Sequence, residues 1–222
     1  MSMSNTPSLV KRVQAHPLLW PVVTLVLILM VNASVPVKTA GEFIQYAKSK
    51  PGVLNYNSAG VGSSTHLAMA YFAKTADIDM VHVPYKGSGP GMQDVLAGVC
   101  QVIFDGAAKP QIDAEKVRLL GTTSSVRDPR YPDVPTLSEG GLTGYDLTYW
   151  VGIFAPKGLP PEIQARLNAS VKTALAEPEV QRKLNNMGMT LVGSSPEQMV
   201  QEIRTETAKL RQIAAAIPGG VN

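Results

Sequence analysis

Short apolar segments that alternate with amphipathic segments are the feature that most constrains the fold of this chain. Apolar runs lie at residues 54–56, 80–83, 100–104, 117–120, 147–154 and 189–192, and stretches with apolar residues at helical spacing separate most of them. Such alternation predicts a parallel sheet with right-handed crossovers. The runs at 100–104 and 117–120 are apolar except for Gln101 and Arg118, and they predict strands that are covered on both faces. The expected fold class is α/β.

Helix boundaries can be predicted from local signals. Thr39 and Glu42 have the spacing of a capping box, which predicts a helix that starts there. Pro90 is expected at the first position of a later helix, and Ser195 is expected to cap the last one. A long helix over residues 160–176 is predicted to turn an apolar stripe inward. The stripe consists of Ile163, Leu167, Val171 and Ala174.

Composition excludes several classes of protein. A hydrophobic content of 45% with 17% charged residues over 222 residues indicates a globular chain of one large or two small domains. The net charge is only +3 and the basic residues form no run, which argues against nucleic-acid binding. Cys100 is the only cysteine, and the three histidines lie far apart. We therefore expect no disulfide, no metal site and no cofactor.

The N-terminal segment allows three interpretations. Lys11 and Arg12 precede an uncharged stretch at residues 17–33, which Pro21 interrupts. The stretch is short for a membrane span, which needs ~20 apolar residues. It matches the apolar region of a signal peptide, with a cleavage site at residues 31–33. The interpretation that we favour is a buried β-strand, because residues 25–31 are rich in Val, Ile and Leu.

The strongest local signal is the glycine-containing string NYNSAGVGSSTHL at residues 55–67. A strand, a glycine turn and a helix start follow one another there, so backbone N–H groups at the start of the helix can bind an anion. No Walker A lysine follows, and the third glycine of a dinucleotide site is absent. The simpler alternative is a tight turn in which Ser63 or Ser64 caps the helix. The candidate ligand-binding residues are Ser58, Gly60, Gly62, Ser63, Ser64 and Thr65.

A second loop lies at the end of the next predicted strand. Tyr85, Lys86, Gly87 and Ser88 offer a phenol, an ammonium group, backbone donors and a hydroxyl. Asp105 ends the following strand, where it could meet a ligand amine or cap a helix. Ligands of open α/β sheets bind at the carboxyl ends of the strands, which favours a binding role for both loops. The alternative for the second loop is a solvated turn.

Catalysis is not expected. Ser63 and His66 could in principle form part of a hydrolase site. The chain has no G-x-S-x-G turn, however, and nothing in the sequence brings Asp94 or Asp105 to His66. A Ser/His hydrolase is therefore the less favoured alternative to a binding protein.

The motifs resemble those of one known family. The matching strings are VPVKT at 35–39, NYNSAGVGSSTHL at 55–67, HVPYKG at 82–87, PDVPTLSEGGLTGY at 132–145, WVGIFAP at 150–156, EPEV at 177–180 and SPEQ at 195–198. Together they resemble the substrate-binding proteins of tripartite tricarboxylate transporters, the TctC or Bug family. The resemblance covers about residues 21–213.

This resemblance implies a periplasmic-binding-protein, or flytrap, architecture. Residues 34–146 would form one complete α/β lobe, residues 147–222 the C-terminal part of the other lobe, and residues 1–33 a crossing strand or a signal-like segment. The implied function is noncatalytic capture, in the periplasm, of a small carboxylate: a di- or tricarboxylate, an aromatic carboxylate or an acidic amino acid. The implied partners are the membrane subunits of the transporter.

The chain also departs from the family pattern. Members are longer at the N-terminus, where half of the first lobe and another glycine-rich loop lie, and residues 1–20 do not resemble that part. Gln101 replaces an acidic residue, and residues 106–109 differ from the family at the edge next to Asp105. The alternative that follows is a truncated, non-binding remnant. In that case the apolar stripes of the helices at 160–176 and 196–215 are expected to lack part of their packing partner.

Overall fold

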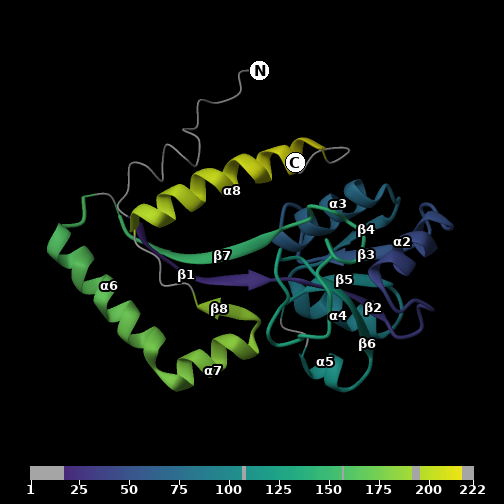
Figure 1. The fold of residues 1–222 in the computed structure, drawn as a ribbon, viewed down its shortest axis with the longest axis horizontal. Helices are drawn as coiled ribbons and strands as arrows, with labels where there is room; N and C mark the ends of the chain where they lie inside the picture. Colours follow the sequence, from purple (N-terminus) through teal and green to yellow (C-terminus); the bar gives the residue numbers. More distant parts are fainter. Residues whose placement is uncertain (1–17, 107–108, 157, 192–195, 217–222) are drawn as a thin grey trace. The chain divides into compact units, whose positions relative to one another are not determined.

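The structure is a computed structural model that describes residues 18–106, 109–156, 158–191 and 196–216. The chain divides into two units (Figure 1). Unit 1 comprises Met1–Leu25 and Trp150–Gln212, and unit 2 comprises Val26–Tyr149 and Ile213–Asn222. The cap that was predicted at Ser195 lies outside the described residues.

Unit 2 is built on a five-stranded sheet in the order β4-β3-β5-β2-β6. The strands are β2 (Ile28–Asn32), β3 (Asn55–Ser58), β4 (Val81–Pro84), β5 (Val102–Asp105) and β6 (Val117–Thr122). Its helices are α2 (Ala40–Lys48), α3 (Ser64–Ala76), α4 (Ser88–Leu96) and the short α5 (Lys109–Asp113). The sequence pattern predicted each of these strands to within a few residues, whereas α5 was not predicted.

The prediction of a wholly parallel sheet is wrong for one strand. β3 pairs in parallel with both β4 and β5, as expected for strand–helix–strand units. β2 runs antiparallel between β5 and β6. The reason is that no single crossover helix joins β2 to either of its neighbours, since α2 leads from β2 to β3, which is not adjacent to it. β2 follows β1 (Leu18–Val26), most of which belongs to unit 1. The sheet of unit 2 is therefore mixed.

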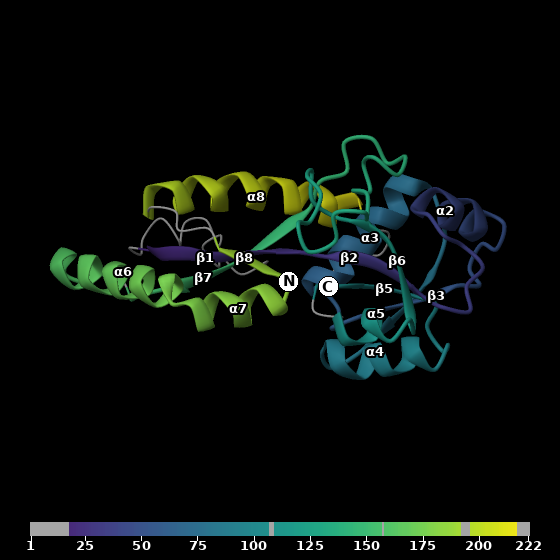
Figure 2. The ribbon, with the colours of Figure 1, turned by 60° about the horizontal axis from the view of Figure 1, so that its bottom comes forward.

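Helices cover both faces of this sheet (Figures 1 and 2). On one face, Met92 and Val95 of α4 pack with Met30 and Ile103 from the sheet. On the other face, Phe72 of α3 packs edge-on against Phe104, the residue after Ile103. Neighbouring residues of a strand point to opposite faces, so both faces of β5 need apolar side chains, and Val102, Ile103 and Phe104 follow one another. This explains why the strand reads as an apolar run in the sequence.

The starts of two helices test the capping predictions. Thr39 caps α2, because its hydroxyl oxygen accepts a hydrogen bond from the N–H of Glu42. The Glu42 carboxylate accepts from the N–H of Lys38, one residue before the cap. The prediction for Pro90 is wrong by two positions, since α4 begins at Ser88 with Gly87 as its cap. Pro90 still lies in the first turn, where a helix needs no N–H at that residue.

Unit 1 contains a three-stranded sheet in the order β7-β1-β8, in which β1 and β8 are antiparallel. Its other elements are β7 (Thr148–Phe154), which begins in unit 2, α6 (Pro161–Ala176), α7 (Pro178–Asn186), β8 (Met189–Leu191) and α8 (Pro196–Ala216), which ends in unit 2. Ile203 of α8 is buried and packs against Trp150 and Val200. The predicted inward stripe of α6 is wrong: Ile163 and Leu167 are 41% and 39% exposed, and no α6 side chain is buried. Their periodicity reflects an amphipathic helix, which alone does not supply a packing partner.

The N-terminal apolar segment is β-structure where it is described. β1 and β2 together span residues 18–32, in agreement with the favoured strand interpretation. The side chains of β2 are all buried. Among the helices of the described residues, none combines the length and hydropathy that a bilayer crossing requires.

Candidate functional site

The candidate site lies at one edge of the unit 2 sheet. β3, β4, β5 and β6 all run in the same direction, so their carboxyl ends, Ser58, Pro84, Asp105 and Thr122, meet at this edge. Both predicted ligand loops leave the sheet here. The sequence prediction that these loops share an edge with Asp105 is therefore confirmed by the strand directions.

Hydrogen bonds within the first loop fix its shape. The hydroxyl oxygen of Ser58 lies 3.1 Å from the carbonyl oxygen of Gly60 and 3.2 Å from its amide nitrogen. The hydroxyl oxygen of Thr65 accepts a bond of 2.9 Å from the N–H of Ala59. Ser58 and Thr65 are both buried. These two hydroxyl groups hold the turn together rather than face an open ligand site.

The start of α3 leaves two backbone donors open. Ser63 is the cap residue, and its hydroxyl oxygen accepts from the N–H of His66. The N–H of Ser63 donates to Gly60, and that of Gly62 donates to Nδ1 of His66. In this described segment, the N–H groups of Ser64 and Thr65 have no acceptor. An anion can accept from both, where the helix dipole also favours negative charge.

The second loop lies directly beside the first. The N–H of Tyr85 donates to the carbonyl of Ser58, and the N–H of Gly87 donates to that of Ala59. Each of the two loops requires a glycine, because Gly60 in the first and Gly87 in the second have φ angles of 134° and 108°. The bonds extend the pairing of β3 and β4 beyond the strands. They bring Lys86, which is exposed, and Ser88, the first residue of α4, to the loop that precedes α3.

The phenol of Tyr85 does not face a ligand site. It donates a hydrogen bond of 2.5 Å to the Asp94 carboxylate and lies 3.6 Å from Sγ of Cys100. This hydrogen bond to Asp94 is the main reason why the pKa of Tyr85 is raised well above its ordinary value. The ring packs into the core cluster beneath α4. Tyr85 thus contributes its backbone to the second loop, whereas its side chain anchors that loop to α4.

Three stacked rings support the first loop, an arrangement that sequence reasoning missed. The rings of His66 and His82 stack with centroids 4.0 Å apart, and Tyr56 stacks on the other side of His82 at 4.9 Å. Nε2 of His82 lies 2.7 Å from the hydroxyl oxygen of Ser58. Burial lowers the pKa of His66, and burial together with the charge on His66 lowers that of His82 to about 4. The sequence did contain a signal for this arrangement. Side chains alternate along a strand, so His82 and Val83 of β4 are expected on opposite faces of the sheet.

The geometry does not pair Ser63 with a catalytic base. The hydroxyl oxygen of Ser63 accepts from the backbone N–H of His66 and lies 3.2 Å from the hydroxyl oxygen of Thr65. Nδ1 of His66 is occupied by Gly62. The ring stacks on His82 instead of facing the serine. A Ser–His nucleophile would need the imidazole nitrogen at the hydroxyl, which is not the arrangement here.

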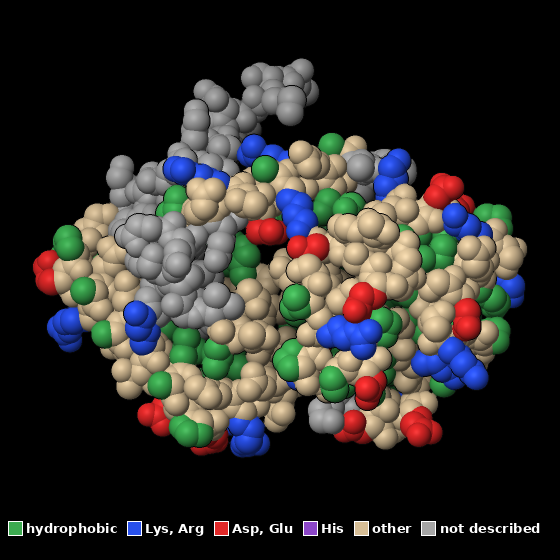
Figure 3. All heavy atoms as spheres, viewed as in Figure 1, with side chains coloured by type: hydrophobic (Ala, Val, Ile, Leu, Met, Phe, Trp, Pro, Cys, Tyr) green, Lys and Arg blue, Asp and Glu red, His purple; other side chains and the backbone are tan. Residues whose placement is uncertain are grey.

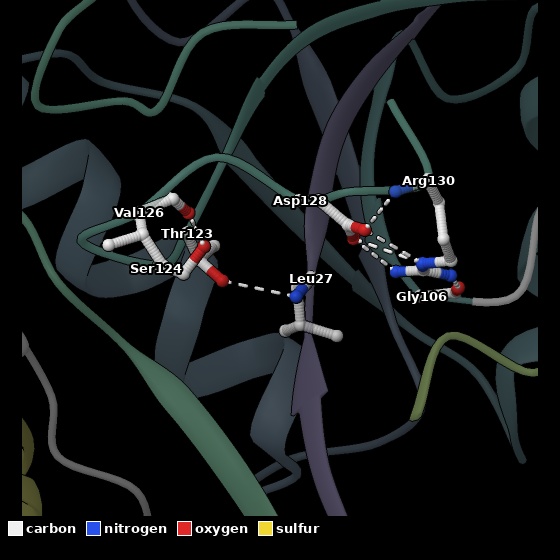
Figure 4. Close-up of polar contacts among 7 residues, drawn as sticks. All are labelled: Leu27, Gly106, Thr123, Ser124, Val126, Asp128 and Arg130. Carbon is white, nitrogen blue, oxygen red and sulfur yellow. Dashed lines mark hydrogen bonds and ion pairs between the residues drawn. The ribbon is translucent and has the colours of Figure 1, made fainter. Parts of the chain in front are cut away.

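The opposite end of the same edge contains two hydrogen-bonded groups (Figure 4). Thr123 accepts from the N–H of Leu27 through its hydroxyl at 3.1 Å, and the N–H of Thr123 donates back to Leu27 at 2.9 Å. Arg130 forms an ion pair with the buried Asp128 and donates to the carbonyl of Gly106 at 3.0 Å. Gly106 follows Asp105 and is the first of the residues, 106–109, whose sequence differs from the family pattern. The bond from Arg130 therefore holds the chain at that point.

Charge does not single out another site. Figure 3 shows Lys and Arg side chains interspersed with Asp and Glu on the visible face of unit 2. Across the residues that the structure describes, no group of three or more His, Cys, Asp or Glu side chains is placed to hold a metal ion.

Comparison with known proteins first defines a class. The fold is the mixed α/β periplasmic-binding-protein type, and its close structural neighbours are solute-binding proteins. The family model for the tripartite tricarboxylate transporter family receptor, TctC, matches residues 9–218. This chain therefore belongs to the TctC family, as its motifs had indicated.

One sequence relative and two solved structures give the extent of the similarity. The UPF0065 protein in the tcbD–tcbE intergenic region of Pseudomonas sp. (strain P51) is 38% identical over 193 residues, which are 86% of this chain and 57% of the relative. The structure of R. palustris Rpa4515 with adipate has a TM-score of 0.84 at 30% identity, covering 91% of this chain and 68% of that one. MatC (Rpa3494) from Rhodopseudomonas palustris with bound malate has a TM-score of 0.81, also at 30% identity, covering 89% and 69%. The chain thus spans little more than half the length of the first relatives by sequence.

Proposed function

We propose that this chain binds a small carboxylate at the start of α3 and presents it to a tripartite tricarboxylate transporter without changing it chemically. The observation that carries the proposal is the pair of open N–H groups of Ser64 and Thr65 at the first turn of α3. Family membership supports it, and so do the adipate and malate named for two structural neighbours. The fold class of those neighbours supports a periplasmic location.

The predicted site residues would have distinct roles in this binding. The backbone of Ser64 and Thr65 would donate to the carboxylate, and the exposed Lys86 would supply a positive charge from the second loop. Ser58, Gly60, Gly62, Ser63 and Thr65 would hold the first loop through the bonds described above. Gly87 and Ser88 would form the start of α4 beside them. Asp105 is acidic, so its carboxylate would favour ligands that carry a donor on that side.

The expected affinity follows from the number of donors. A hydrogen bond to a charged group contributes about 1.5–3 kcal/mol net. Two backbone donors and an ammonium group, less the cost of ordering the ligand, would give about −4 to −8 kcal/mol, or binding between the millimolar and the micromolar range. An uncharged ester of the same acid would lose most of this binding free energy.

The experiment that tests the proposal is a calorimetric titration of the purified chain. The ligands are adipate, malate, citrate, benzoate and glutamate at constant ionic strength, with dimethyl adipate as the uncharged control. We expect at least one free acid to bind and the diester not to bind. Mass spectrometry of the recovered ligand should show it unchanged. A chain that binds none of the acids, or that converts the bound ligand to a product, would contradict the proposal.

Association with the membrane subunits is a separate test. If the chain serves a transporter, membrane vesicles that contain those subunits should take up the bound carboxylate faster in the presence of the purified chain. Uptake that is unaffected by the loaded chain would limit its function to binding.

A further inference from the structure

Two tyrosines near the end of unit 2 hold α3 from the side. The hydroxyl of Tyr145 donates to the carbonyl of Ala68 at 3.1 Å, and the hydroxyl of Tyr149 donates to the carbonyl of Ser64 at 2.7 Å. The two acceptors are four residues apart, so they lie one turn apart on the same side of the helix. The two tyrosines therefore make the same kind of bond to the same helix at different heights.

Their surroundings differ. Tyr145 is 1% exposed, stacks on Tyr71 with ring centroids 5.0 Å apart, and meets Phe72 edge-on. Tyr149 is only partly buried. The bond from Tyr145 reaches a residue within the packed helix. There the C=O and the N–H of the peptide group both take part in helical hydrogen bonds. The bond from Tyr149 reaches the first helical residue.

The peptide group that accepts from Tyr149 also carries one of the open donors. A peptide bond is planar, so the carbonyl of Ser64 and the N–H of Thr65 move as one rigid group. A carbonyl oxygen has two lone pairs and can accept the tyrosine hydroxyl in addition to a helical N–H. A bond to the oxygen fixes the plane, and it polarises the N–H at the other end into a better donor.

We infer that Tyr149 is a positioning residue, which aims and strengthens the Thr65 N–H for anion binding through its bond to the Ser64 carbonyl. The inference rests on the proposed function. Tyr149 lies in β7 and is the last residue of this stretch of unit 2, so the same contact links the start of α3 to a strand that continues into unit 1. Tyr145 serves as the matched control, because it bonds to α3 away from the open donors.

The test compares Tyr149→Phe with Tyr145→Phe in the full chain. The first measurement is the affinity for malate and adipate, with inorganic phosphate as a minimal anion. Tyr149→Phe is expected to weaken binding by about three- to ten-fold, the size of one lost hydrogen bond, whereas Tyr145→Phe should stay within about two-fold. Tyr145→Phe is instead expected to lower the midpoint of thermal unfolding.

The second measurement does not depend on a ligand. The amide proton resonance of Thr65 in the free protein should shift upfield in Tyr149→Phe, because its peptide group loses polarisation, and should be unchanged in Tyr145→Phe. An unchanged Thr65 resonance, or equal losses of affinity in both variants, would overturn the inference. If the wild-type chain binds none of the three anions, the proposed function fails, and the Thr65 resonance alone then decides whether Tyr149 orients this peptide group.

Discussion

The backbone N–H of Gly62 donates a hydrogen bond to Nδ1 of His66, with 3.0 Å between the nitrogens. The imidazole can accept there only when it is neutral, so its proton is on Nε2. This bond removes Gly62 from the set of donors that a glycine loop would offer to an anion. The open N–H groups of Ser64 and Thr65, two and three residues further along, remain for an anion. The glycine is needed for its φ of 75°, which lets the loop fold back onto the ring.

His66→Ala is expected to destabilise the chain more than it weakens binding. The change removes the acceptor for Gly62 and the ring that stacks on His82, each worth about 0.5–1.5 kcal/mol. The free energy of unfolding should fall by roughly 1–3 kcal/mol in urea titrations. Carboxylate affinity should change only a few-fold, since the Ser64 and Thr65 donors remain. A loss of all binding in a variant of unchanged stability would show that the imidazole contacts the ligand directly.

The stacked histidines should make stability depend on pH in a defined direction. In the folded chain the pKa of His82 is lowered to about 4 by burial and by the charge on His66, whereas an unfolded chain titrates near 6.5. Between these values the unfolded chain binds a proton that the folded chain does not, so the free energy of unfolding decreases as the pH falls from about 6.5 to about 4. Above 6.5 this contribution is fully present. His82→Gln should flatten the profile in this window, and an equally steep profile in that variant would contradict the assignment to His82.

The cap of α3 allows stability to be separated from anion binding. Ser63→Asp keeps a side-chain oxygen that can accept from the N–H of His66, and aspartate is as good a cap as serine. It also places a negative charge beside the open donors. We expect stability near that of wild type and a loss of carboxylate affinity of at least about ten-fold, measured by calorimetry.

Ser63→Ala is the matched variant for this test. It should lose about 1 kcal/mol of stability with the cap while its carboxylate affinity stays within a few-fold. If Ser63→Asp binds carboxylates as tightly as Ser63→Ala does, the anion does not bind at the start of α3.

The order of elements in unit 2 was predictable because it depends on local patterns. Apolar runs indicate the strands, and the sequence offers Ser63 as one of two candidate caps of α3, which the structure confirms. The direction of β2 was not predictable from such patterns. A buried strand can have the same apolar sequence in either direction. Its direction depends on the connections that join it to its neighbours in the sheet.

The positions of the two candidate loops were predictable from the sequence, but the contacts of their side chains were not. The HVPYKG string contains both His82 and Tyr85, and only the structure shows that one supports the first loop while the other bonds to Asp94. Those partners are 24 and 9 residues away along the chain. Tyr149 reaches Ser64 across 85 residues, which no local pattern can reveal.

Two glycines of α4 should respond differently to the same substitution. A Cβ at Gly91 would lie 2.6 Å from the side-chain amide nitrogen of Asn57 and 3.3 Å from the ring of Tyr85. A Cβ at Gly89 would meet nothing within 4 Å apart from its chain neighbours. Gly91→Ala is expected to cost about 1–3 kcal/mol through overpacking, despite the better helix propensity of alanine. Gly89→Ala should change the stability by less than about 1 kcal/mol, because the contact of its Cβ with the ring of Pro90 offsets the better helix propensity of alanine. Thermal and urea unfolding of both variants check this, and stabilisation by both would mean that α4 moves freely over Asn57.

The helices of the two units should differ in their protection against hydrogen exchange. α3 buries six side chains, among them Met69 and Phe72, so its amides should open only with the unfolding of unit 2. No side chain of α6 or α7 is buried, and Ile163 and Leu167 of α6 are exposed. We expect α6 amides to exchange at least roughly 100-fold faster than those of α3, equivalent to ~3 kcal/mol in opening free energy. Exposed apolar residues also favour association, so exchange in α6 should slow as protein concentration rises. Protection of α6 equal to that of α3 in a dilute monomer would show that α6 is held by packing that its exposed side chains do not reveal.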